Sequence, residues 1–303
     1  MDKTIVEEIK KLKKQRNAII LAHNYQREEI QDIADFVGDS LELSKKATQV
    51  QCDVIVFCGV HFMAETAAIL NPDKTVLLPE IEAGCPMADT VNIRELKEWI
   101  KKYPNSPVIS YVNTTAEVKS LSYACCTSAN APQIVKAVPF DSIIFVPDKN
   151  LADWAKKQVP EKEIIPWNGF CPTHHMIKKD DVIRAKNIYP DALVVVHPEC
   201  RPEVIELADH VASTSGMVRF AKSSQAKEFI IGTEIGLLYR LRKENPDKKF
   251  YPLKTNMICP NMKITTLESV LRALKENKYI IQVPEDIRLK AYEAVQRMFN
   301  LMS

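Results

Sequence analysis

Apolar runs of five or six residues recur along the chain, and three of them open similar stretches of sequence. These runs span residues 18–23, 107–111 and 192–197. A short run that is apolar on both faces is typical of a strand buried in a parallel sheet. The runs end in His23, Tyr111 and His197, and a polar loop follows each of them. The pattern therefore predicts three equivalent strands, each with a polar or aromatic side chain at its carboxyl end.

A small hydroxyl residue follows each of these strand ends at a constant distance. The residues that lie 17 positions beyond the three strand ends are Ser40, Ser128 and Thr214. Helical patterns begin just after the first two of them. Because Ser and Thr are favoured N-cap residues, the simplest prediction is that these hydroxyls cap helices.

The second half of the repeat ends in a cysteine. A second strand-like run begins at residues 53, 141 and 228, and a helical pattern and a third short strand follow each run. A Cys-Pro step comes next in every case. The three cysteines are Cys85, Cys171 and Cys259, which are 86 and 88 positions apart. They therefore occupy equivalent positions in the three copies of the repeated unit.

Strands that alternate with helices at these lengths form right-handed βαβ units with a parallel sheet. The repeat predicts an α/β fold of three α/β/α sandwich units, each with a short parallel sheet. A pseudo-threefold axis should relate the units, with the active site at that axis. In the closing segment, a helix over 265–277 should pack against the N-terminal helix, ahead of a last amphipathic helix over 286–302. The expected domains are residues 1–87, closed by residues 264–303, then residues 88–174 and residues 175–263.

Composition and charge argue against several classes of function. The 303 residues are 46% hydrophobic and 26% charged, and the net charge of +2 comes from mixed signs, so we expect no nucleic-acid partner. The N-terminus reads as a charged amphipathic helix without a signal core, and no apolar run approaches the ~20 residues of a membrane span. We therefore expect a cytoplasmic protein without a membrane partner. No Gly-rich dinucleotide or phosphate loop occurs among the seven glycines.

In parallel α/β sheets, ligands bind beyond the carboxyl ends of the strands, where helix N-termini also point. A threefold arrangement turns these ends of the three units toward one another. The polar side chains that should converge there are His23, Tyr25, Ser40, Cys85, Tyr111, Asn113, Ser128, Cys171, His174, His197, Glu199, Thr214 and Cys259.

Three thiolates from distant loops suit zinc or an iron–sulfur cluster. No CxxC pair is present, so neither a zinc ribbon nor a local ferredoxin motif fits. A [4Fe–4S] cluster with three protein ligands leaves one iron open as a Lewis acid. The alternative is that the Cys-Pro steps are only turns inherited with the triplicated fold. The cysteines at positions 52, 58, 125 and 126 read more simply as small buried residues.

The other candidates supply anion binding and proton transfer. A hydroxyl beside the free N–H groups of a helix N-terminus can hold a carboxylate or a phosphate. His23, Tyr25, His197 and Glu199 are the acid–base candidates, because His titrates near neutral pH and burial can tune Glu. His174 lies close enough to Cys171 in sequence to contact either a substrate or a cluster.

The residues assembled in this way resemble the quinolinate synthases of type A, the iron–sulfur enzymes of the bacterial and archaeal route to NAD. Together the matching stretches are specific, and they run through most of the chain. They are residues 22–26, 38–40, 85–88, 111–114, 127–131, 147–151, 197–200, 213–217, 232–236 and 261–263.

The resemblance implies condensation of iminosuccinate (iminoaspartate) with dihydroxyacetone phosphate to quinolinate, phosphate and water. It implies one [4Fe–4S] cluster per chain on Cys85, Cys171 and Cys259, whose unliganded iron binds the substrate. It also implies proton transfer by Tyr25 and Glu199. The residues it implies as substrate-binding are His23, Ser40, Tyr111, Asn113, Ser128, His174, His197, Glu199 and Thr214.

Other functions remain compatible with the same residues. A [4Fe–4S] hydro-lyase of another polycarboxylate would share the open iron and the anion sites. An iron–sulfur sensor would need a partner surface, and the sequence shows no basic stripe for one. A zinc-binding α/β protein is a further alternative. The expected partners are the two small-molecule substrates, with possible coupling to an aspartate oxidase or dehydrogenase that supplies iminosuccinate.

Overall fold

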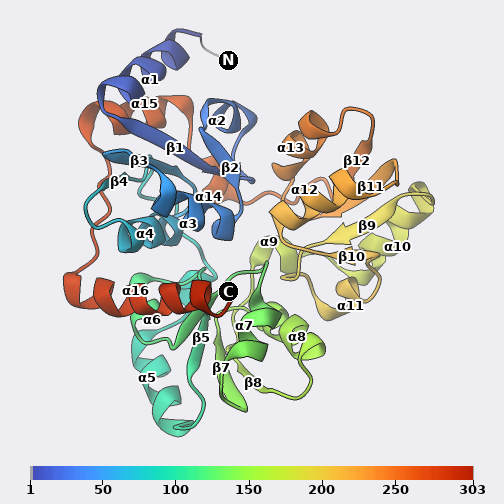
Figure 1. Ribbon diagram of the computed structural model, residues 1–303. Helices are drawn as coiled ribbons and strands as arrows, with labels where there is room; N and C mark the ends of the chain where they lie inside the picture. The colour runs from blue at the N-terminus through green and yellow to red at the C-terminus, as the bar shows by residue number, and fades with distance from the viewer. Residues whose placement is uncertain (1–2, 303) are drawn as a thin grey trace.

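The chain forms three four-stranded parallel sheets that share one strand order. The computed structural model describes residues 3–302. The orders are β2-β1-β3-β4, β6-β5-β7-β8 and β10-β9-β11-β12, and every pairing between these strands is parallel. Figure 1 shows the three units around a common centre, with α9 and α14 between them. The predicted α/β architecture of three sheet-bearing units is confirmed.

The strands follow the apolar runs of the sequence. Those of the first sheet are β1 Ala18–His23, β2 Phe36–Gly38, β3 Val54–Cys58 and β4 Thr75–Leu77. Those of the second are β5 Val108–Tyr111, β6 Ala124–Cys126, β7 Ser142–Val146 and β8 Glu163–Pro166. Those of the third are β9 Leu193–Val196, β10 His210–Val211, β11 Glu228–Gly232 and β12 Lys249–Pro252.

The helices repeat with the strands. A short helix follows the first strand of each unit: α2 Glu28–Ile33, α6 Ala116–Ser120 and α11 Pro202–Ile205. Longer helices flank the central strand: α3 Ser40–Gln49, α4 His61–Leu70, α7 Ala131–Ala137, α8 Lys149–Gln158, α12 Thr214–Ser223 and α13 Leu237–Glu244. A helical turn follows each Cys-Pro step, namely η1 Ala88–Thr90, α9 Pro172–His175 and α14 Pro260–Lys263, and then a linker helix, namely α5 Ile93–Lys102, α10 Lys179–Ile188 and α15 Leu267–Glu276. The remaining helices are α1 Lys3–Gln15 and α16 Glu285–Asn300.

Both faces of each sheet are buried, which explains why the strands are apolar throughout. In the first unit, Leu21 and Ile55 pack into a cluster on one face, whereas Ile20 and Val56 pack into another cluster on the opposite face. Successive side chains of a strand point to opposite faces, so neighbouring residues feed separate cores.

The edge strands β2, β6 and β10 were not predicted. They contain only two or three residues each, which is too short for a periodic signal. Cys125 and Cys126 lie in β6.

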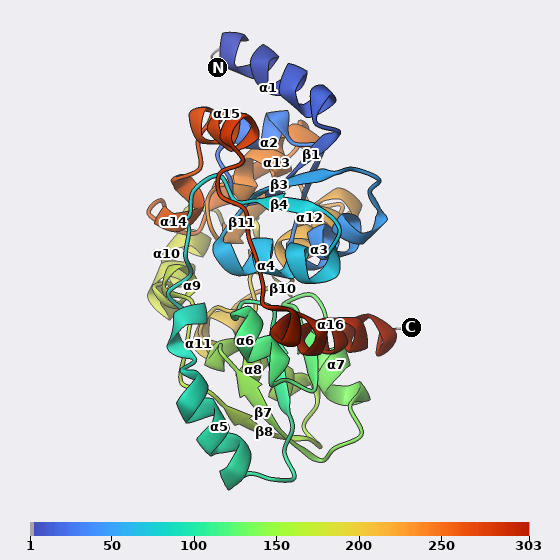
Figure 2. The ribbon, with the colours of Figure 1, turned by 90° about the vertical axis from the view of Figure 1, so that its left-hand side faces the viewer.

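The segment after the third unit returns to the first two. As predicted, α15 packs against α1. Helix α16 packs mainly against α6 and β6 of the second unit and less extensively against α4 of the first (Figure 2). The segment 264–303 therefore does not close the first unit alone. The other domain boundaries stay a prediction, and residues 1, 2 and 303 of the expected domains lie outside the described range.

Candidate active site

The strand ends bring polar side chains to the centre of the molecule. His23 ends β1, Tyr111 ends β5 and His197 follows β9, and all three are buried. They line one cavity of about 160 Å³. The structure brings every one of the predicted site residues to this cavity, namely His23, Tyr25, Ser40, Cys85, Tyr111, Asn113, Ser128, Cys171, His174, His197, Glu199, Thr214 and Cys259.

The three repeated cysteines reach this cavity from three different units. Each is a free thiol that begins a helical turn or lies just ahead of one. Burial raises the pKa of the Cys85 thiol to about 12, and Cys259 acts in the same direction. Burial also raises the pKa of Cys171, with Glu199 and Cys85 acting in the same direction. Burial disfavours the free thiolates because their charge is not compensated. A metal that replaces the thiol protons would compensate this charge, so the donor set fits a three-thiolate centre.

The remaining cysteines lie elsewhere. Among the residues that the structure describes, none of Cys52, Cys58, Cys125, Cys126 and Cys200 lines the cavity, and all five are buried. Their surroundings are those of small core residues. The thiols at the cavity are therefore confined to the three repeated positions.

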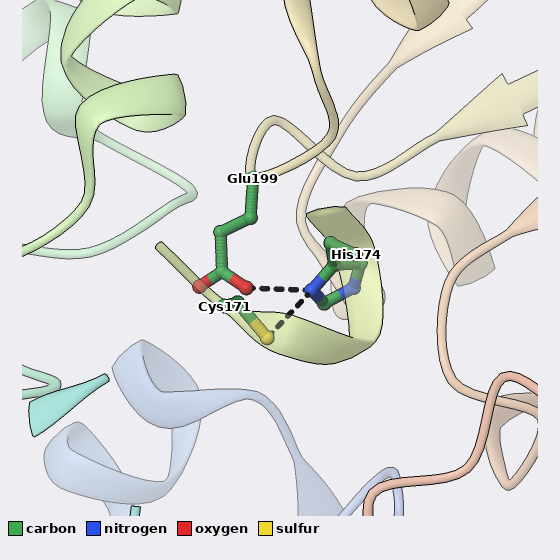
Figure 3. Close-up of side chains that lie close together, drawn as sticks. All are labelled: Cys171, His174 and Glu199. Carbon is green, nitrogen blue, oxygen red and sulfur yellow. Dashed lines mark hydrogen bonds and ion pairs between the residues drawn. The ribbon is translucent and has the colours of Figure 1, made fainter. Parts of the chain in front are cut away.

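Glu199 and His174 form a close pair beside Cys171 (Figure 3). Nδ1 of His174 lies 2.7 Å from Oε2 of Glu199 and 3.2 Å from Sγ of Cys171. The carboxylate is the closer acceptor and carries charge, so we assign the Nδ1 proton to the bond with Glu199. Burial acts to raise the pKa of Glu199, but His197 and His174 outweigh burial and lower it. Glu199 is therefore ionised and able to accept a proton.

Cys171, His174 and Glu199 are also close enough to suggest a separate metal site. Their ligand atoms all lie within 4.8 Å of one another. In a tetrahedral site with metal–ligand bonds of ~2.1 Å, however, two ligand atoms lie about 3.4 Å apart. The 2.7 Å between His174 and Glu199 is a hydrogen-bond distance. In this arrangement the pair shares a proton, and Cys171 is the member of the group that suits a metal.

Two histidines occupy equivalent positions and have the same tautomer. The N–H of Tyr25 donates to Nδ1 of His23, at 3.2 Å, and the N–H of Glu199 donates to Nδ1 of His197, at 3.3 Å. Each imidazole thus keeps its own proton on Nε2. Burial lowers the pKa of both histidines to about 3, with Glu199 acting in the opposite direction. Both imidazoles are therefore neutral and carry their N–H at Nε2.

A hydrogen-bonded group links Tyr25 to His174 through a residue that is not among the predicted site residues. Oγ1 of Thr233 lies 2.5 Å from the Tyr25 hydroxyl and 2.8 Å from Nε2 of His174. Burial raises the pKa of Tyr25 well above its usual range, as does Glu199, so the phenol is protonated. Its place directly after β11 and within the matching stretch 232–236 could have marked Thr233.

The hydroxyls at the constant 17-residue offset do not cap helices, and this prediction is wrong. Asp39 caps α3, and its carboxylate accepts from the N–H groups of Leu41 and Glu42. Ser213 caps α12 in the same way, and the N-cap position of α7 is Asn130. A neighbouring side chain therefore satisfies the N–H groups of α3 and α12. Ser40 and Thr214 become the first residues of these helices and line the cavity together with Ser128.

The remainder of the cavity combines polar groups with an apolar wall. Oδ1 of Asn113 is buried without a hydrogen-bond partner in the described part of the chain, as expected of a group that awaits a ligand. Burial raises the pKa of the Tyr111 hydroxyl well above its usual range, and the negative charge of Glu199 acts in the same direction. The sequence did not indicate the apolar lining residues Val60, Phe62, Met63, Met87 and Met262.

In residues 3–302, no helix has both the length and the apolar character needed to cross a bilayer.

Comparison with known proteins identifies the family. The model of the family described as "Quinolinate synthetase A protein" matches residues 7–300. A protein named quinolinate synthase from Thermodesulfovibrio yellowstonii is 83% identical over 298 residues, which are 98% of each chain. Proteins of the same name from Caldicellulosiruptor saccharolyticus (98% of each chain) and Methanosarcina barkeri (97% of this chain and 96% of the other) are 58% and 56% identical. The match extends over nearly the whole chain, so this protein belongs to the quinolinate synthase family.

Proposed function

We propose that this protein is a quinolinate synthase that condenses iminosuccinate with dihydroxyacetone phosphate to quinolinate, phosphate and water in NAD biosynthesis. The observation that carries the proposal is the single buried cavity where three free thiols from three units meet the Glu199–His174 pair and Tyr25. The family and the names of the relatives support the same reaction. An aspartate oxidase or dehydrogenase would supply the iminosuccinate. The free thiols of the described chain suit the cytoplasm, a reducing compartment.

Cys85, Cys171 and Cys259 would hold a [4Fe–4S] cluster. No other cysteine among the described residues lines the cavity, so these thiols would bind three of the four irons of the cluster. When bound, the cluster would supply a Lewis-acidic iron that has no protein ligand.

The substrates would bind through the remainder of the cavity. The hydroxyls of Ser40 and Thr214 lie at the N-termini of α3 and α12, where helix dipoles favour carboxylate and phosphate groups. The neutral His23 and His197 would donate from Nε2 to substrate oxygens. The free Oδ1 of Asn113 would accept from a substrate N–H or O–H.

Glu199 and Tyr25 would move the protons. The Glu199 carboxylate can take a proton from a carbon next to a carbonyl or imine, while His174 stabilises its charge. Tyr25 is held as a phenol and can donate a proton to a leaving hydroxyl. The apolar wall of Val60, Phe62 and Met63 would limit the access of water to the reacting groups.

Anaerobic purification followed by iron and sulfide analysis and a quinolinate assay tests the proposal. We expect about four iron and four sulfide per chain. We also expect quinolinate to form from iminosuccinate and dihydroxyacetone phosphate. Stoichiometric zinc without sulfide, or a fully loaded protein that forms no quinolinate, would refute it.

Thr233→Val tests the hydrogen-bonded group around Tyr25. Valine keeps the shape of threonine but removes the hydroxyl that contacts both Tyr25 and His174. Loss of such a bond costs about 1.4 kcal/mol, or about 10-fold in kcat, and the substrate KM should stay unchanged. Steady-state kinetics measure both constants. Thr233→Ser is the matched control and should restore kcat, whereas a normal kcat in the valine variant would contradict the assignment.

A further inference from the structure

The three cysteine loops share one main-chain hydrogen bond. In each unit, the third residue beyond β3, β7 or β11 donates its N–H to the carbonyl two residues before the cysteine. The bonds run from His61 to Ala83 (2.7 Å), from Lys149 to Gly169 (2.9 Å) and from Ile235 to Met257 (3.0 Å). The three loops are therefore structurally equivalent up to this bond, and any difference beyond it distinguishes one cysteine from the others.

In the second unit, a buried carboxylate adds a further bond to the loop. Asp148 is fully buried, and its Oδ2 accepts from the N–H of Cys171 at 3.1 Å. Its Oδ1 accepts from the N–H of Leu151 at 2.8 Å and thereby caps α8. One side chain thus serves both the helix and the cysteine.

In the third unit, a longer carboxylate side chain likewise accepts from both the cysteine loop and the start of a helix. Glu234 is fully buried, and its Oε1 accepts from the N–H of Cys259 at 3.3 Å. Its Oε2 accepts from the N–H of Gly236 at 2.7 Å, at the start of α13. Nζ of Lys263 lies 3.0 Å from Oε1 and compensates the charge of the carboxylate.

The first unit lacks the carboxylate. The residue at the equivalent position, before His61, is Val60, which is buried and has no side-chain bond to α4. Within residues 3–302, no side chain accepts from the N–H of Cys85 in the way that Asp148 and Glu234 accept from the other two cysteines. The triplicated fold therefore holds the N–H of two of its three cysteines with carboxylates. The loop of Cys85 is bonded differently, because the carbonyl of Gly84 accepts from Nδ2 of Asn261 at 2.7 Å.

We infer that Asp148 and Glu234 are positioning residues that orient Cys171 and Cys259 before a metal centre is loaded. This inference rests on the proposed cluster on the three cysteines. An N–H that is held by a carboxylate fixes the backbone next to the thiol, so less conformational freedom is lost when the sulfur binds. Outer-shell partners of this kind contribute to metal affinity as well as to geometry.

Asp148→Ser separates the two tasks of Asp148. Serine can still cap α8, but it is too short to hold the N–H of Cys171 as well. We expect iron loss to a chelator, followed by absorbance, to become about 10-fold faster than in the parent protein. In the cluster-free protein, mass spectrometry after limited alkylation should show faster modification of Cys171 and an unchanged rate at Cys259.

Glu234→Gln should have the corresponding effect on Cys259. The amide NH₂ replaces one of the two oxygens. The bond to the Cys259 N–H is the longer of the two main-chain bonds (3.3 Å against 2.7 Å for Gly236), so we expect the NH₂ to face Cys259 and this bond to be lost. Cys259 should then be alkylated faster, with Cys171 unchanged, and iron should again be lost faster. Asp148→Asn keeps one acceptor of two with little change in volume, and it gives the second-unit test if the serine variant does not fold.

Asn92→Ala is the matched control. Asn92 caps α5 but contacts no cysteine, so this variant should lower the melting temperature and leave iron loss unchanged. Unchanged iron loss in both carboxylate variants, or simultaneous exposure of both thiols in each, would overturn the inference. A parent protein that binds no iron would refute the proposed cluster instead, and the alkylation rates would still decide whether the carboxylates position the thiols.

Discussion

Replacing Cys171 with alanine is expected to abolish both iron binding and quinolinate formation in protein purified without oxygen. The variant keeps two of the three thiols that line the cavity, and two thiolates from separate units cannot hold the cluster. The loss should exceed the roughly 10- to 100-fold drop in metal affinity that follows removal of an outer-shell partner. Iron and sulfide content, the brown colour and turnover measure the effect, and Cys85→Ala and Cys259→Ala should behave in the same way.

Cys126→Ala is the matched control for the cysteine variants. Cys126 is fully buried in β6 and does not line the cavity. Its removal should lower stability and leave the iron content unchanged. If the Cys171 variant kept a full cluster and full activity, the three-cysteine assignment would be wrong.

Glu199→Gln is expected to lower kcat by about 10²- to 10⁴-fold, the usual contribution of a general acid or base. Glutamine has the same shape and can still accept from His174, but it cannot take a proton at neutral pH. The iron content should stay at the parent level, because Glu199 is bonded to His174 through an ordinary hydrogen bond. Anaerobic steady-state kinetics and iron analysis of the same preparation separate the two effects.

Glu203→Gln provides the control for Glu199. Its carboxylate is 45% exposed and lies 3.9 Å from Arg201 at the surface. Surface ion pairs contribute little, so its kcat should match that of the parent. A Glu199→Gln variant with parental kcat would remove Glu199 from the proton-transfer steps.

The architecture could be predicted because the same pattern of strands and helices occurs three times in the sequence. Buried strands of a parallel sheet are apolar on both faces, and their carboxyl ends lie at one edge. Residues such as His23, Tyr111 and His197 could therefore be assigned to a common site from their equivalent positions in the repeat alone. The repeat also predicted that Cys85, Cys171 and Cys259 would meet although they are far apart in sequence.

The features that were missed depend on contacts between distant segments or on very short elements. Thr233 contacts Tyr25, which lies 208 positions away, and nothing local marks that contact. Asp39 and Ser213 replaced the predicted capping residues, because each is adjacent to the predicted residue and both types cap helices equally well. A strand of two residues such as β10 carries no periodicity.

The return of α15 to the first unit has a consequence for how the chain is made. Val270, Ala273 and Leu274 of α15 cover the face of the first sheet that carries Ile20 and Val56. A ribosome synthesises α15 only after all twelve strands, so this face is covered only in part, by Val6 and Ile9 of α1 and Ile30 of α2, while the other two units emerge. The first sheet to be made is therefore among the last to be fully covered, and its uncovered apolar area favours aggregation until α15 has been made.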